Sequence, residues 1–135
     1  MGRVLLGGLL AGVVLNIGEF LFNGVLMAKQ MKEWMSQHNL SDPGTSFMVI
    51  ATILTFLLGI VMVWLYAMIR GRLGAGPKTA IVAALIMWFA IGVYSGLIYG
   101  LIIAVPMNLM IMGIAWCLVE YVLGALAGAW LYKEA

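Results

Sequence analysis

The sequence has very little charge, one cysteine and one histidine in 135 residues. A single cysteine, Cys117, excludes an internal disulfide, and a single histidine, His38, excludes a histidine-clustered metal or haem site within one chain. Charged residues make up 9% of the chain and hydrophobic residues 65%. This leaves too few polar side chains to cover the surface of a soluble domain. We expect no nucleic-acid partner.

Motifs for catalysis are also missing from the sequence. Hydrolases, metalloproteases and thiol oxidoreductases typically have a Ser-His-Asp arrangement, a Cys-His pair, an HExxH motif or a CxxC motif. The sequence contains none of these four patterns. We therefore expect the protein not to be an enzyme, with no catalytic residue and no bound metal or cofactor.

Long hydrophobic runs dominate the chain instead, and its mean hydropathy is +1.14. Each run has the roughly 20 residues that cross a bilayer as a helix. Apolar residues at helical spacing after the first run indicate an amphipathic extension on the membrane surface. The prediction is one all-α transmembrane domain over residues 1–135, an antiparallel up-down bundle of four helices at about 4–27 with an extension to about 38, 47–69, 79–103 and 109–132.

Basic residues are distributed unevenly between the two ends of the predicted spans. One end has five of them, whereas the other end has Lys29 and Lys32. Because positive charge is enriched in cytoplasmic loops, both termini are predicted to be cytoplasmic. The predicted location is a bacterial inner membrane, where the chain is in contact with the lipid bilayer. The five basic residues are Arg3, Arg70, Arg72, Lys78 and Lys133.

Glycines recur at intervals of four residues within three of the runs. In a membrane, small residues at this spacing let helix backbones approach closely and so provide packing energy. The grooves can be filled by the chain's own helices or by another protein, which is either a different membrane subunit or a second copy. The predicted helix-packing residues are Gly8, Gly12, Gly92, Gly96, Gly100, Gly124 and Gly128.

Polar residues inside the runs are few, and helical spacing groups them. Asn16, Glu19 and Asn23 share one arc of the first helix with its glycine pair, and Glu120 shares an arc of the fourth helix with small residues. Glu19 lies roughly 12 Å and Glu120 roughly 16 Å from the outer ends of their spans. Spacing alone leaves open whether the two arcs face each other. The other candidates for this outer-half polar layer are Thr55, Tyr94 and Ser95.

A carboxylate at this depth costs about 3 kcal/mol, so it is usually protonated, paired or exposed to water. The runs contain no Lys or Arg. Glu19 and Glu120 must therefore be protonated, bond to each other, or use a cation, water, ligand or partner helix. One interpretation is a proton, cation or ligand site, and the other is that protonated glutamates and asparagines hold the bundle together.

Several segments together resemble a family of small bacterial four-helix membrane proteins for which no activity is established. The resemblance covers nearly the whole chain, implies the four-helix membrane fold, and assigns no functional residue. The segments that carry it are Gly12–Asn16, Asn23–Leu26, Trp64–Arg70, Gly74–Ala80 and Ala115–Tyr121.

These observations favour an accessory or scaffold subunit of a larger inner-membrane complex, such as an energy-converting one. The first alternative is a small proton or cation transporter or channel that uses Glu19 and Glu120. The second is binding of a lipid, quinone or pigment in the outer-half polar pocket. The almost purely apolar cytoplasmic half of the spans argues against an open conducting path.

Overall fold

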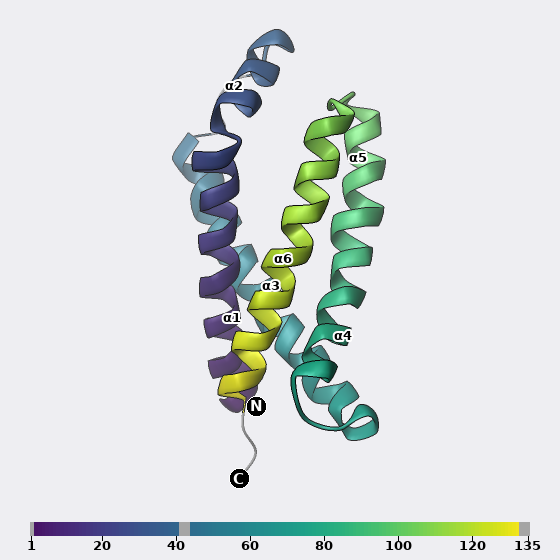
Figure 1. Ribbon diagram of the computed structural model, residues 1–135. Coiled ribbons are helices and arrows are strands. Elements are labelled where there is room, and N and C mark those ends of the chain that lie inside the picture. The colour runs from purple at the N-terminus through teal and green to yellow at the C-terminus, as the bar shows by residue number, and fades with distance from the viewer. Residues whose placement is uncertain (1, 41–43, 133–135) are drawn as a thin grey trace.

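The computed structural model describes residues 2–40 and 44–132, and every regular element in these ranges is a helix (Figure 1). The all-α prediction is therefore confirmed. Four helical stretches are long and apolar enough to cross a membrane, as expected for a multi-pass membrane protein. They are Gly2–Leu26, Gly44–Leu73, Pro77–Ile102 and Met107–Leu131.

The first span changes its helical form before it ends. It begins as α1, Gly2–Leu21, and continues as a π-helical stretch, η1, over Phe22–Leu26. The helix breaks at Met27, where φ is −115° and ψ is 11°. A separate helix, α2, then covers Ala28–Gln37. The extension expected to about residue 38 is thus helical, but it is not continuous with the span.

The second span is the single helix α3, Gly44–Leu73. It ends at Leu73 and is followed by Gly74, whose φ of +86° is a left-handed conformation that favours glycine. The Gly74 amide donates to the carbonyl oxygen of Arg70 at 2.9 Å, which closes the last turn. Pro77 starts the next helix, α4, over Pro77–Met87, where its missing N–H costs no hydrogen bond.

The third span has three parts, and a short turn joins it to the fourth. After α4 comes a second π-helical stretch, η2, over Trp88–Ser95, followed by α5 over Gly96–Ile102. Ala104, with a φ of 57°, lies in the turn. The fourth span is α6, Met107–Leu131. This connection is too short for anything but antiparallel neighbours.

Successive spans run in alternating directions, so the start of α1 and the end of α6 lie at one end of the molecule (Figure 1). The turn between α3 and α4 is at this end, and α2 is at the other. Lys133 lies outside the described residues. The other basic residues of the predicted cytoplasmic end, Arg3, Arg70, Arg72 and Lys78, belong to the start of α1 or to the segment around this turn.

The helices pack most extensively near the end that holds the termini. There α1 contacts α3 and α6, while α4 contacts both α3 and α6. By contrast, residues 44–54 at the start of α3 are exposed except for half-buried Ala51. The buried core consists of Leu15, Met62, Tyr66, Ala80, Ala83, Ala84, Met87, Tyr121 and Ala125.

Glycines allow α1 and α3 to meet backbone to backbone. A methyl group at Gly59 of α3 would lie 2.5 Å from the Gly12 nitrogen and 2.6 Å from the Gly8 oxygen. These distances are shorter than non-bonded carbon contacts tolerate. The Gly8 and Gly12 face of α1 is therefore covered by α3 and faces neither lipid nor α6.

Candidate functional site: a carboxyl pair beside two cavities

A second face of α1 that is formed by small residues packs against α6. A methyl group at Gly7 would lie 2.7 Å from the Gly128 carbonyl oxygen, and one at Gly124 would lie 3.1 Å from the Leu15 side chain. Close approach of this kind lets backbones and short side chains pack without lipid between them. Further along the same contact, Gly18 of α1 meets a glutamate of α6.

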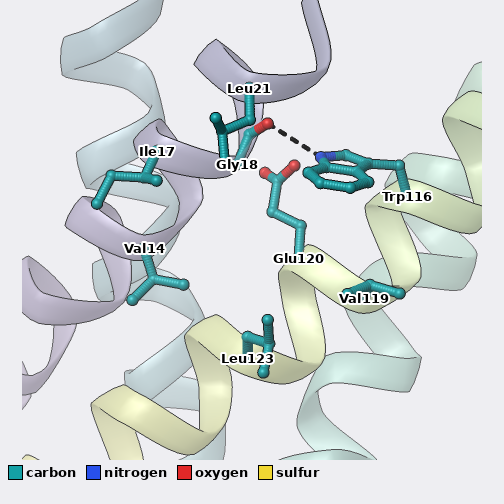
Figure 2. A pocket seen from close by; sticks show the side chains of 8 residues that line it. All are labelled: Val14, Ile17, Gly18, Leu21, Trp116, Val119, Glu120 and Leu123. Atoms are coloured by element: carbon teal, nitrogen blue, oxygen red, sulfur yellow. Dashed lines mark hydrogen bonds between the residues drawn. The ribbon is translucent and has the colours of Figure 1, made fainter. Parts of the chain in front are cut away.

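Glu120 occupies the space that a side chain at position 18 would fill. A methyl group at Gly18 would lie 2.7 Å from Glu120 Cγ and 3.0 Å from its carboxyl carbon. Only 4% of Glu120 is exposed. Beside it, Trp116 Nε1 donates to the Gly18 carbonyl oxygen at 3.0 Å (Figure 2). The indole thereby ties α1 to α6 at the carboxyl group.

Glu19, the next residue on α1, brings a second carboxyl group to this place. Its side chain lies within reach of the Glu120 carboxyl for hydrogen bonding and direct charge interaction. Asn23 Nδ2 donates to Glu19 Oε2 at 2.9 Å and to its backbone oxygen at 3.1 Å. The two glutamates therefore form a pair across α1 and α6. A hydrogen bond within the pair requires a proton on one carboxyl group.

The first cavity beside the pair has a volume of about 290 Å³ and lies between α1 and α6. Ile17, Val119 and Leu123 on its rim are each about half exposed, so it opens at a surface that lipid tails would contact. Figure 2 shows Glu120 among the lining side chains. The full lining is Val14, Ile17, Gly18, Leu21, Trp116, Val119, Glu120 and Leu123.

The second cavity, of about 360 Å³, lies between α6 and the third span and reaches Glu19. Cys117 and Tyr121 of α6 line it, together with glycines of η2, α5 and α6. Each carboxyl group of the pair thus belongs to a different cavity. The glycines that line this second cavity are Gly92, Gly96, Gly100 and Gly113.

The site is acidic and contains no basic side chain. Residues 4–28 and 79–132 contain no Lys or Arg, so neither α1 nor α6 supplies a compensating charge near the carboxyl pair. Within the described residues, no group of three or more His, Cys, Asp or Glu side chains could hold a metal ion. Two neighbouring carboxyl groups can bind a proton or a cation, either of which would compensate their charge.

The other predicted polar residues bond within their own helices. Asn16 Nδ2 donates to the backbone oxygen four residues earlier at 2.9 Å, and Thr55 does the same at 2.7 Å. Ser95 Oγ donates to the oxygen five residues earlier at 3.1 Å. Tyr94 is 63% exposed. None of these four residues lines either cavity, so the structure brings together only Glu19, Glu120 and Asn23.

The glycines of the third span divide into two kinds. A methyl group at Gly92 would lie 3.0 Å from Cys117 Sγ, and one at Gly100 would meet the Met110 sulfur, so α6 covers both positions. At Gly96 the nearest neighbours would be 4.0 Å away. The second cavity is open at this glycine.

Sequence reasoning missed two residues of the site, Gly18 and Trp116. Ala11 follows Gly7 after four residues and Gly18 follows Ala11 after seven, which places all three on one face of a helix. That spacing was a usable signal for the α6 contact. Trp116 gave no such signal, because an interfacial or packing tryptophan has the same sequence pattern.

No family model matches the chain, and comparison with curated proteins and with solved structures finds no match.

Proposed function

We propose that the protein moves protons or cations across the bacterial inner membrane by means of Glu19 and Glu120. In this proposal the four helices form an antiparallel bundle with both termini in the cytoplasm. The observation that supports it best is the buried Glu120 carboxyl, paired with Glu19 across two spans.

The energetics of the pair support exchange of a positive charge. One ionised carboxylate at membrane depth costs about 3 kcal/mol, and a second one beside it would add charge repulsion. Because residues 4–28 and 79–132, which surround the two glutamates in the chain, lack Lys and Arg, the compensating charge must come from outside. A proton or a bound cation would provide this charge, and the carboxyl pair would bind whichever of the two is available.

The packing of the buried core favours a carrier mechanism over an open channel. Buried residues such as Met62, Tyr66 and Ala84 fill the half of the spans nearer the termini. The cavities at Glu19 and Glu120 do not include these residues. A transported ion would therefore need a rearrangement of the helices to pass this half, which is how carriers alternate access.

Flux into reconstituted vesicles tests the proposal. Glu19→Gln combined with Glu120→Gln removes both titratable carboxyls while keeping side-chain size, so flux of protons or monovalent cations should fall to the level of empty vesicles. Glu33→Gln on α2, outside the four spans, is the matched control and should leave flux unchanged. Unaltered flux in the double variant would contradict the proposal.

A second candidate is an accessory subunit of a larger membrane complex. The open position at Gly96 beside the second cavity favours it, because a partner helix could approach the backbone there. Gly96→Leu should then abolish co-purification of a stoichiometric partner from native membranes in mild detergent. Gly71→Leu, at a position without neighbours, is the control. Monomeric protein with no partner would rule this candidate out.

A further inference from the structure

The first cavity offers acceptors and no free donor to a bound molecule. Of its lining residues, only Trp116 and Glu120 carry polar side-chain atoms. The Trp116 N–H already donates to the Gly18 carbonyl oxygen. A phosphate, carboxylate or quinone headgroup is recognised through donors, and this lining has none to give except a protonated Glu120.

An inorganic cation also fits this cavity poorly. Metal ions such as Ca²⁺ and Mg²⁺ need several oxygen ligands to replace their water, whereas the remaining walls are the aliphatic side chains of Val14, Ile17, Leu21, Val119 and Leu123. An alkyl or aryl ammonium ion needs no such shell. Its carbon substituents would bury against these walls.

We propose that the first cavity binds a hydrophobic organic cation, with its charge on the Glu120 carboxylate and its apolar groups between α1 and α6. The half-exposed rim at Ile17, Val119 and Leu123 lets the cation enter from the lipid. The Trp116 ring adds an aromatic surface of the kind that attracts quaternary ammonium groups. The inference rests on the proposed function and names the cargo class for Glu120.

Direct binding to the whole protein in lipid nanodiscs tests the inference. The probe is radiolabelled benzyltrimethylammonium, which has a permanent charge and an aromatic group. Neopentylbenzene, in which carbon replaces the charged nitrogen, is the neutral competitor of the same shape. The cation should bind saturably, and the neutral analogue should compete only weakly.

Three variants assign the binding to this cavity. Glu120→Gln should weaken binding by about thirtyfold or more, since it removes the charge opposite a partly buried cation. Leu123→Trp should also abolish binding, because it fills the cavity while keeping the carboxyl. Ile111→Trp on α6 is the control, because Ile111 is similarly exposed and lines neither cavity. It should bind as the unaltered protein does.

Each contrary result has a distinct meaning. Equal competition by neopentylbenzene would overturn the inference and leave a site for neutral lipophiles. Full binding by Glu120→Gln would overturn it by showing that the Glu120 carboxylate does not hold the cation. If the cation did not bind but proton flux still depended on the glutamates, this inference would be overturned and the proposed transport would stand. Cation binding that needs Glu120, in vesicles without glutamate-dependent flux, would overturn the proposed transport and support the binding site.

Discussion

The Glu120 side chain fills the space between α1 and α6 that a side chain at position 18 would need, and Gly18 has no side chain. Gly18→Ala would place a methyl group 2.7 Å from Glu120 Cγ. The Glu120 side chain must then shift from its position beside Glu19. We expect Gly18→Ala to reduce proton or cation flux in vesicles strongly. Gly71→Ala, where a methyl group has no neighbour within 4 Å, should leave flux unchanged, and equal flux in both variants would contradict this role of Gly18.

Trp116 contributes a hydrogen bond between helices that phenylalanine cannot make. Trp116→Phe removes the donor to the Gly18 carbonyl oxygen but keeps an aromatic ring opposite Phe22, whose centroid is now 5.8 Å away. The loss should cost about 1 kcal/mol of stability, measured as unfolding in mild detergent with added denaturant. Trp64→Phe, on α3 and 47% exposed, should cost clearly less. The opposite order would show that the bond is not stabilising.

The glutamates could be identified from the sequence, but their surroundings could not. An ionisable residue within an apolar run is visible in any sequence, and helical spacing grouped Glu19 with Asn23, which donates to its carboxyl group at 2.9 Å. The same spacing also grouped Gly8 and Gly12 with Glu19, yet the glycine pair packs on α3 while Glu19 reaches Glu120 on α6. Spacing shows which residues share a face, whereas the neighbouring helix depends on the whole packing arrangement.

The contact between α1 and α3 depends on glycine backbones. Gly59→Ala would place its methyl group 2.5 Å from the Gly12 nitrogen, and backbone atoms cannot yield as a side chain can. We expect a loss of about 1–3 kcal/mol in unfolding free energy. Gly71→Ala in the same helix should instead be neutral or stabilise by up to about 1 kcal/mol, since alanine favours helix. Similar losses at both positions would contradict the close contact.

The spans could be predicted from hydropathy because apolar length is a direct signal for a membrane helix. The break at Met27 and the π-helical stretches η1 and η2 could not. Apolar residues continue through all three segments, so the sequence pattern alone does not distinguish an α turn from a wider one. Asn23 and Gly24, both weak helix formers, were the only local sign of irregularity in η1.

The alternating helices place the α3–α4 turn at the same end as the start of α1, and α2 at the other (Figure 1). The excess of basic residues at the first end predicts that it is cytoplasmic. Under the proposed transport function, this orientation would determine from which side ions reach the carboxyl pair.

Cysteine labelling in intact cells tests the orientation. In a Cys117→Ala background, which removes the only native thiol, Ser36→Cys reports on α2 and Ala75→Cys on the α3–α4 turn. Both positions are exposed, so a membrane-impermeant maleimide should label Ser36→Cys in intact spheroplasts and Ala75→Cys only after the membrane is opened. Each variant controls for the reactivity of the other. The reverse pattern would place the termini outside, and labelling of both before opening would mean that the chain inserts in two orientations, which the uneven basic charge argues against.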